Sequence, residues 1–234
     1  MKRFYKTAEA GPDESGFAVM LDAKPMNTPA RKRLVAPTRA LAEAIAAEWA
    51  AQGEEVVLAS MRLTRLLATA LDQFMPDPTH AIGPIANYAT SDLLCHRADA
   101  PADLRRRQDA LWQPIVDWAI LRYDAPLKVG AGVMPLRQSS QALTAIRLAV
   151  SEYDAHRLSG LLVVTTCSGS VLLALALAEQ RIDIDQAWAA TDLDEGYQRE
   201  QWGDDPLAAR RRADVEADLR AAARYLKLLD SAPT

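Results

Sequence analysis

The sequence predicts an α+β protein with a small N-terminal α+β domain, residues 1–60, followed by a larger all-α helical domain, residues 61–234. Two patterns lead to this prediction. Short apolar runs separated by turn residues fill the first part of the chain, whereas apolar residues recur at helical spacing through the rest. Because 50% of the residues are hydrophobic and 25% are charged, as in ordinary globular proteins, we expect packed cores.

Turn residues between two apolar runs predict a β-hairpin near the start of the chain. Residues 4–8 and 17–21 are the expected strands, and residues 11–16, which hold two glycines and a proline, are the expected turn. The prolines at positions 25 and 29 restrict the preceding residues to extended backbone, and residues 34–36 can form a further short strand. These segments together predict a small sheet.

One amphipathic helix is expected to pack on this sheet. Thr38 is a favourable N-cap, apolar residues then recur at helical spacing as far as Trp49, and Gly53 closes the element. Residues 56–58 are the last strand expected in the N-terminal domain.

The second part of the chain is expected to be helical, with one turn-rich segment at residues 124–138. Pro101 predicts the start of a long helix that reaches Tyr123 and is kinked at Pro114. Other helices are expected at residues 63–71, 80–90, 139–152, 155–166 and 170–179.

Two more helices are expected near the C-terminus. Asp185 is expected to cap a helix that runs towards Trp202, and Pro206 is expected to open the last one.

Residues 158–178 contain no charge, which makes a membrane span worth testing. The polar break at residues 165–170 favours two buried helices instead, because each apolar half is too short to cross a bilayer.

The composition disfavours several classes of function. The formal net charge is −4 and the pI is about 5.5, so no overall positive field attracts nucleic acid. Cys95 and Cys167 lie far apart in apolar stretches, which predicts free buried thiols. Three separated histidines show no metal-ligand spacing, and no phosphate-binding loop is present, so we expect neither a metal nor a cofactor.

Two weaker motifs remain. The segment around Ser170 resembles an activated serine only superficially, because the Gly-x-Ser-x-Gly pattern is absent, and a helix start explains it better. The arginine triplets at residues 105–107 and 210–212 could contact anionic partners. Solvated helix faces partly paired with nearby acids are the favoured interpretation.

Acidic, aromatic and amide residues are interleaved at residues 192–205. On a helix, Glu195 shares a face with Asp192, Arg199 and Trp202. A polar protein-binding surface anchored by Tyr197 and Trp202 is the favoured interpretation, because aromatic side chains beside charges are typical of interface hot spots. Ordinary helix solvation with a buried tryptophan, and a carboxylate pair that catalyses hydrolysis, remain alternatives.

Short motifs follow one another in a defined order along nearly the whole chain. They are Arg3-Phe4-Tyr5-Lys6, Leu21-Asp22, Thr28-Pro29, Leu41-Ala42, Ala47-Glu48-Trp49, Gln52, Met61, Leu63-Thr64, Tyr88, Ser91-Asp92-Leu93-Leu94-Cys95, Arg97-Ala98, Gln108, Trp112, Pro114, Trp118, Ser168-Gly169-Ser170, Ala174-Leu175-Ala176, Ala187-Trp188, Asp194-Glu195, Gln198 and Trp202-Gly203. Each motif alone is common, but their joint order is specific, and it resembles the ATP synthase F1 complex assembly factor 2 family.

The resemblance implies an assembly chaperone, not an enzyme. Such a chaperone would bind the unassembled α subunit of F1-ATPase and shield its β-subunit interface, without ATP hydrolysis. No nucleic acid, membrane insertion or small-molecule substrate is expected. The alternative is a hydrolase that uses Ser170 or the carboxylates around Glu195.

In the family a carboxylate of the Asp-Glu motif is associated with function, which corresponds to Glu195 here. The partner-binding residues expected on this basis are Glu195, Asp194, Tyr197, Gln198 and Trp202. The first residues contain no apolar signal core, so we expect a bacterial-type cytoplasmic protein, whereas eukaryotic relatives act in the mitochondrial matrix.

Overall fold

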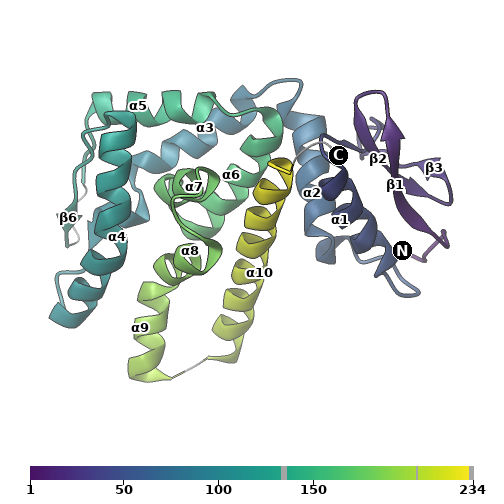
Figure 1. Ribbon diagram of the computed structural model, residues 1–234. Coiled ribbons are helices and arrows are strands. Elements are labelled where there is room, and N and C mark those ends of the chain that lie inside the picture. Colours follow the sequence, from purple (N-terminus) through teal and green to yellow (C-terminus); the bar gives the residue numbers. More distant parts are fainter. Residues whose placement is uncertain (133–135, 204, 232–234) are drawn as a thin grey trace. The chain divides into compact units, whose positions relative to one another are not determined.

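The computed structural model describes residues 1–132, 136–203 and 205–231 (Figure 1). Within these ranges a small antiparallel sheet precedes a series of helices, which confirms the predicted α+β class. Part of the predicted turn-rich segment, and Asp204 of the acidic segment, lie outside the described residues.

Contacts between residues group the chain into two compact units. Unit 1 is formed by Met1–His80, Asp154–Gly160 and the residues from Ala221 onwards, and unit 2 by Ala81–Tyr153 and Leu161–Arg220. Helices α6 (Ala155–Ser168) and α10 (Pro206–Leu229) therefore each contribute to both units. The division into folding domains at residue 60 stays a prediction, because these units are defined by contacts alone.

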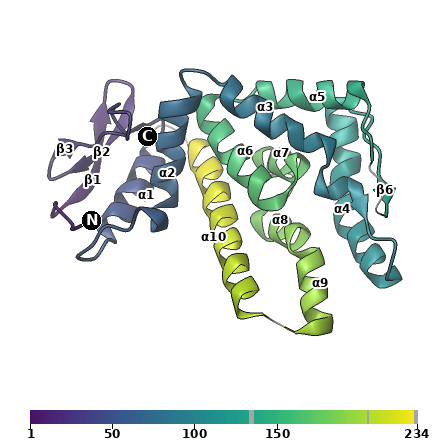
Figure 2. The same cartoon turned by 180° about the vertical axis from the view of Figure 1, so that it is seen from behind.

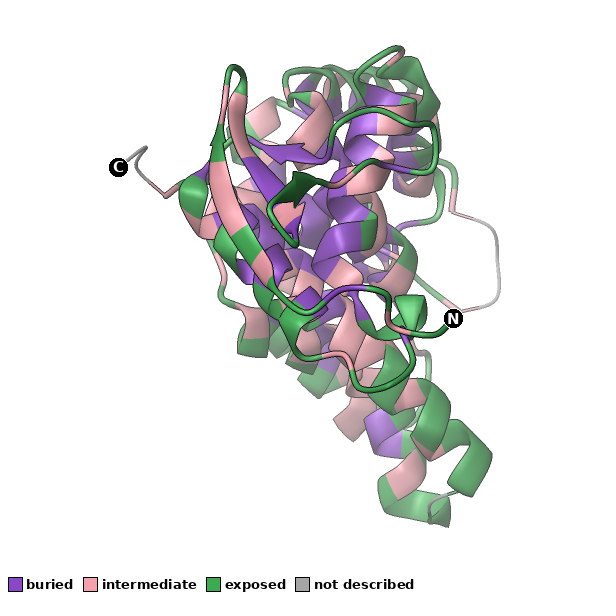
Figure 3. Ribbon diagram, turned by 90° about the vertical axis from the view of Figure 1, so that its right-hand side faces the viewer, coloured by how far each residue is buried: buried purple, intermediate pink, exposed green. Residues whose placement is uncertain are grey.

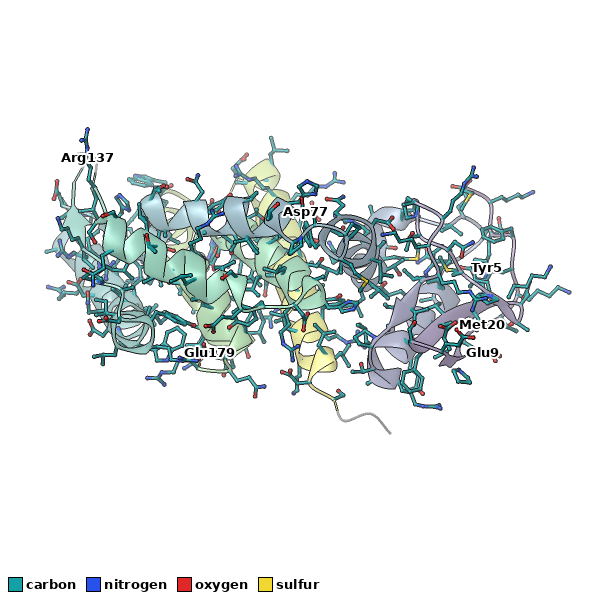
Figure 4. All side chains as sticks on the ribbon, turned by 90° about the horizontal axis from the view of Figure 1, so that it is seen from above. Tyr5, Glu9, Met20, Asp77, Arg137 and Glu179 are labelled. Atoms are coloured by element: carbon teal, nitrogen blue, oxygen red, sulfur yellow. The ribbon has the colours of Figure 1, made fainter. Side chains whose placement is uncertain are left out.

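The sheet of unit 1 is built around its second strand. Strands β1 (Ala8–Asp13) and β2 (Gly16–Leu21) pair antiparallel along their whole length, and Glu9 lies opposite Met20 (Figure 4). Two short strands also pair with β2, and they are β3 (Lys24–Pro25) and β4 (Val35–Ala36).

The predicted hairpin is confirmed, but its first strand is not at residues 4–8. Gly11 and Pro12, which were expected in the turn, lie within β1. Because β1 is at the end of the strand order, a proline there leaves no gap in the interior of the hydrogen-bonded sheet. The turn itself is shorter, and the carboxylate of Asp13 accepts a hydrogen bond from the Ser15 amide at 3.3 Å.

Helix α1 (Arg39–Ala50) packs on β1 and β2, and the Thr38 side chain caps it by accepting a hydrogen bond from the Leu41 amide, as predicted. The buried residues of α1 form the core of unit 1 with the inner face of the sheet (Figure 3). The strand predicted at residues 56–58 is wrong. The Val57 amide donates to the side chain of Gln52 at 2.8 Å, so it does not join a strand ladder.

Helix α2 (Arg62–Thr69) follows a short 3-10 turn, η1 (Leu58–Ser60), and continues as a π-helical segment, η2 (Ala70–Phe74). Glu48 of α1 provides hydrogen-bond acceptors for the free amides at the start of α2. Its carboxylate accepts from the amides of Leu63 and Thr64 at 2.8 and 2.9 Å.

Segments far apart in the sequence complete unit 1. The Ser159 hydroxyl of α6 donates to the carbonyl of Leu66 at 2.8 Å, and the Thr38 hydroxyl donates to the carbonyl of Leu228 at 2.8 Å. Arg157 of α6 pairs with Asp230 at 2.6 Å.

Unit 2 consists mainly of helices, seen from both sides in Figures 1 and 2. Its elements, besides parts of α6 and α10, are α3 (Thr79–Asn87), whose first two residues belong to unit 1, η3 (Tyr88–Thr90), η4 (Leu93–Cys95), α4 (Ala102–Tyr123), α5 (Ser140–Ser151), α7 (Val171–Ala178), α8 (Ile184–Thr191) and α9 (Leu193–Trp202). One detail differs from the all-helical expectation, since β5 (His96–Arg97) pairs parallel with β6 (Gly130–Ala131).

Helix α7 lies in the core of unit 2 and packs against α4 and α8. All of its residues from Val171 to Leu177 are buried, and the helix is apolar on every side, as expected of a central helix. Gly169, at a φ of 71°, and Ser170 separate α7 from α6. Among the described residues, no helix is long and apolar enough to cross a membrane.

The helix predicted from Asp185 to Trp202 is two helices, α8 and α9. Asp183, not Asp185, caps α8, and it forms a capping box with Gln186. Asp192 separates the two helices, and its carboxylate pairs with Arg212 of α10. That pairing comes from a distant part of the chain and explains why spacing alone did not reveal the break.

Candidate functional site

Helix α9, which carries the five predicted partner-binding residues, is anchored on α4. Gln108 of α4 donates to the carboxylate of Asp194 at 2.8 Å, and the Tyr197 hydroxyl lies 3.0 Å from both carboxylate oxygens of Asp103. Arg107 of α4 pairs with Glu200 of α9 at 2.8 Å. The inner face of α9 is thus fixed by three separate polar contacts, one for each turn of the helix.

The side chain of Gln108 has a second role. It is only 2% exposed, and its oxygen accepts a hydrogen bond from the Ala98 amide at 2.8 Å while its nitrogen donates to Asp194. One buried amide therefore links the chain before α4 to the start of α9. A buried glutamine with both ends satisfied orients its neighbours in a single way.

The other face of α9 is open to solvent. Glu195, Gln198 and Trp202 are exposed and recur at helical spacing, so they lie on one face of the helix. Trp202 is 79% exposed, which is unusual for such a large apolar side chain. Figure 3 shows exposed residues gathering where α9 ends and α10 begins.

The predicted site is therefore divided between two faces. Asp194 and Tyr197 point towards α4, and Tyr197 is only 7% exposed. Glu195, Gln198 and Trp202 form the open face, which we call the α9 face. The first two residues position the helix, and the other three can contact a partner.

The start of α9 is held by a charge cluster. The Asp192 carboxylate pairs with Arg212 of α10 and lies 3.7 Å from Arg199 of α9. The Arg212 guanidinium also lies over the ring of Trp188, 5.1 Å from its centroid. Gly196 is buried beside this cluster, where an added Cβ atom would come within 3.3 Å of the Asp192 carboxylate.

The contacts beneath α9 change proton affinities. The hydrogen bond from Tyr197 lowers the pKa of Asp103, because it stabilises the ionised carboxylate. The pKa of Tyr197 is raised, first by burial and then by its bond to Asp103. The hydrogen bond between Arg107 and Glu200 raises the pKa of Arg107. All three changes favour the protonation states present at neutral pH.

Comparison with known proteins identifies the group to which this chain belongs. A family model described as ATP12 chaperone protein matches residues 2–120. The chain belongs to the ATP12 chaperone family. The family resemblance predicted from the sequence motifs is thereby confirmed.

Solved structures of the family extend the likeness to almost the whole chain. Atp12 from Paracoccus denitrificans is 37% identical, with a TM-score of 0.89, over 97% of this chain and 98% of that one. A single-residue mutant of the same protein gives 36% identity and a TM-score of 0.89, over 97% of each chain. A candidate chaperone from Agrobacterium tumefaciens, Atu1473, is 41% identical, with a TM-score of 0.91, over 98% of this chain and 86% of that one.

In this member of the ATP12 chaperone family, Ser170 is not placed to act as a nucleophile. Ser170 is fully buried and caps α7, since its oxygen accepts from the Leu173 amide and its hydroxyl donates to Asp92 at 2.7 Å. A substrate could not reach this hydroxyl without unfolding the core. Among the described residues, no group of three or more histidine, cysteine or acidic side chains could hold a metal ion.

Three arginines of the two triplets form ion pairs. Arg105 pairs with Asp109 at 3.1 Å, as the spacing predicted, whereas Arg107 and Arg212 reach partners on other helices. These two arginines serve to fix α9. This role was missed, because their partners lie about twenty residues or more away in the chain.

Asp103 and Gln108 are the other residues of the site that sequence reasoning did not assign. Both lie on α4, far from α9 in sequence, so only the packing of the two helices brings them together. Gln108 belongs to the motifs that carry the family resemblance, and that was the available signal.

Proposed function

We propose that this protein binds the unassembled α subunit of F1-ATPase and shields its β-subunit interface until the F1 sector assembles, without ATP hydrolysis. Membership of a chaperone family and the likeness to Atp12 along the whole chain support this proposal. We place its action in the cytoplasm of a bacterial cell, as expected from the sequence.

The observation that carries the proposal is the α9 face. An apolar aromatic at 79% exposure costs free energy in water, and a partner that covers it recovers that energy. Glu195 and Gln198 precede it on the same face of α9 and provide groups that accept and donate hydrogen bonds. Such an aromatic anchor with a polar margin is typical of a reversible protein interface.

A shielding role requires a contact that can be released. An unassembled subunit exposes an apolar interface, and covering it suppresses self-association. The α9 face is small and polar at its margin, so the β subunit can displace it by competition without a nucleotide-driven step.

The test is the affinity of purified F1 α subunit for variants of the α9 face, measured by calorimetry. We expect Glu195→Gln and Trp202→Ala each to weaken binding by about tenfold or more, as removal of interface hot spots does. Glu14→Gln is the matched control, since Glu14 is an exposed glutamate on unit 1. Unchanged affinity in both α9 variants would refute the assignment of this face.

Two further readouts test the function itself. Adding purified β subunit should release the chaperone from α, and adding ATP alone should not. If the wild-type protein does not bind F1 α at all, the proposed client is wrong.

A further inference from the structure

Helix α4 carries a second exposed feature on a different face from its contacts with α9. Leu111, Pro114, Trp118 and Leu121 follow one another at intervals of three, four and three residues, which places them on one stripe of the helix. Leu111 is 42% exposed and Leu121 is 84% exposed. Alternating intervals of three and four are the pattern by which one helix packs against another.

Three hollows lie along this stripe. The first, of about 220 Å³, is lined by Leu111, Pro114 and Arg181, and the second, of about 430 Å³, by Pro114, Trp118, Leu121 and Arg181. The two share Pro114 and Arg181, so they are neighbouring parts of one depression.

The third hollow extends the depression to α5. It has a volume of about 710 Å³ and shares Leu121 and Arg122 with the second. Leu148 of α5, which is 60% exposed, lines it as well. We call the combined surface of Leu111, Pro114, Trp118, Leu121, Leu148 and Arg181 the α4 groove. The stripe on α4 alone is about 15 Å long, equal to about three turns of a helix.

Charges of both signs line the groove, since Asp117, Asp124 and Glu152 lie in it together with Arg122 and Arg181. Arg122 pairs with Glu179, labelled in Figure 4, at 2.9 Å, and Asp117 accepts a hydrogen bond from Gln113 at 2.8 Å. Arg181 is exposed in the centre of the groove, and among the described residues no carboxylate pairs with it. An occupant with an acidic side chain at its centre complements this charge.

The shape of the groove indicates what can occupy it. The groove is a shallow depression that is open to solvent at its two larger hollows. A convex helix with apolar side chains at matching intervals fits such a depression. We propose that the α4 groove binds an amphipathic helix of the client, with a carboxylate of that helix paired to Arg181.

This inference rests on the proposed function for the identity of the client. It adds a second contact surface, separate from the α9 face, and gives the chemistry of the segment that binds there. Two separate contacts on one client increase the total affinity through effective concentration, even when each is weak.

The test measures the affinity of purified F1 α subunit for Arg181→Glu and Leu121→Asp by calorimetry. We expect each variant to bind about tenfold more weakly or worse, because one repels the acidic side chain and the other places a charge in an apolar contact. The matched controls are Arg147→Glu, an exposed arginine on α5 outside the groove, and Leu58→Asp at a leucine 57% exposed on unit 1. Both controls should bind within about twofold of wild type, as non-interface substitutions do.

Each outcome separates the inference from the proposed function. If the wild type binds F1 α and both groove variants bind equally well, the groove inference is wrong and the function stands. If the wild type does not bind F1 α, the proposed function fails and the groove inference fails with it. A wild-type dimer that Arg181→Glu converts to a monomer in sedimentation equilibrium would assign the groove to a second copy and overturn the inference.

A photo-crosslinker at position 121 identifies the occupant directly, because Leu121 lines the groove and is 84% exposed. Mass spectrometry of the crosslinked complex should recover a client segment with apolar residues three and four apart and an acidic residue between them. Recovery of an extended or wholly polar segment would contradict the helix proposal. Circular dichroism of each variant confirms that folding is unchanged.

Discussion

The carboxylate of Asp92 accepts a hydrogen bond of 2.7 Å from the hydroxyl of Ser170 in the core of unit 2. The same carboxylate accepts from the amides of Leu94 at 3.0 Å and Leu172 at 3.1 Å. The buried Asp92 carboxylate therefore accepts hydrogen bonds at the start of both η4 and α7, which are separated by almost eighty residues. Three donors compensate in part for its removal from water.

We expect Asp92→Asn to reduce the free energy of unfolding by about 1–3 kcal/mol. One amide oxygen can replace the atom that accepts from Leu94 and Ser170, but the amide nitrogen then faces the Leu172 amide, and two donors oppose each other. Urea denaturation at pH 4, where the protonated carboxyl group of Asp92 is compared with a neutral amide, measures the loss. Asp185→Asn, at a side chain 78% exposed, is the control and should change stability by less than about 0.5 kcal/mol. Equal stability of Asp92→Asn and wild type would show that the buried bonds contribute nothing.

The same carboxyl group should make stability depend on pH. Burial raises the pKa of Asp92 from 3.8 to about 6, against the opposing effect of its hydrogen bonds. Between these values the folded protein holds a proton that the unfolded chain releases. The stabilisation from this proton is complete below about pH 4 and is lost as the pH rises through about 6, by about 3 kcal/mol in total.

Urea denaturation between pH 4 and pH 7 tests this dependence. Because other acidic groups contribute slopes of their own, the measured quantity is the difference between wild type and Asp92→Asn at each pH. That difference should shift by about 3 kcal/mol across the range, in the direction that weakens the wild type as the pH rises. A constant difference would mean that Asp92 titrates alike in the folded and unfolded states.

Gly160→Ala should destabilise unit 1 by about 1–3 kcal/mol, as overpacking does. A Cβ atom there would lie 2.7 Å from Cδ2 and 2.8 Å from Cγ of Leu226, which is itself buried. Gly83→Ala in α3 is the matched control, because no atom lies within 4 Å of its added Cβ and alanine favours the helix. The melting temperature should fall in Gly160→Ala and rise in Gly83→Ala. A similar melting temperature for both would show that Leu226 moves aside without cost.

Tyr197→Phe should raise the pKa of Asp103, because the hydroxyl that stabilises its carboxylate is removed. The folded carboxyl group in the wild type has a lowered pKa, so its contribution to stability is present above the unfolded pKa and is lost as the pH falls through the folded value. Titration of the Asp103 carboxyl carbon by NMR measures the change. A second titration in Glu200→Gln controls for general effects of altering the contact between α4 and α9. An unchanged titration of Asp103 in Tyr197→Phe would contradict the bond.

Local signals predicted much of the fold. Thr38, Ser139 and Ser170 each precede a helix and were expected at helix starts, and each accepts a hydrogen bond from an amide in the first turn. These caps depend only on residues close in sequence. The extent of β1 was mispredicted, since Gly11 and Pro12 are tolerated on an edge strand. The break at Asp192 was missed because Arg212 holds it from α10.

For the candidate site too, patterns local in sequence were predictive and contacts between distant segments were not. Helical spacing correctly placed Glu195 and Trp202 on one face of a helix. Spacing could not show that Tyr197 is buried, because its partner Asp103 lies on α4. The α4 groove was not predicted either, since two of its six residues, Leu148 and Arg181, come from other parts of the chain.

Unit 1 is assembled from three stretches of chain, and the last of them begins at Ala221. During synthesis the sheet and α1 leave the ribosome long before Tyr225 and Leu229, which are buried in the same unit. The sheet and α1 must therefore wait, with part of their apolar surface uncovered, until α10 has been translated. A molecule of a chaperone family is in this respect itself vulnerable to aggregation until α10 arrives.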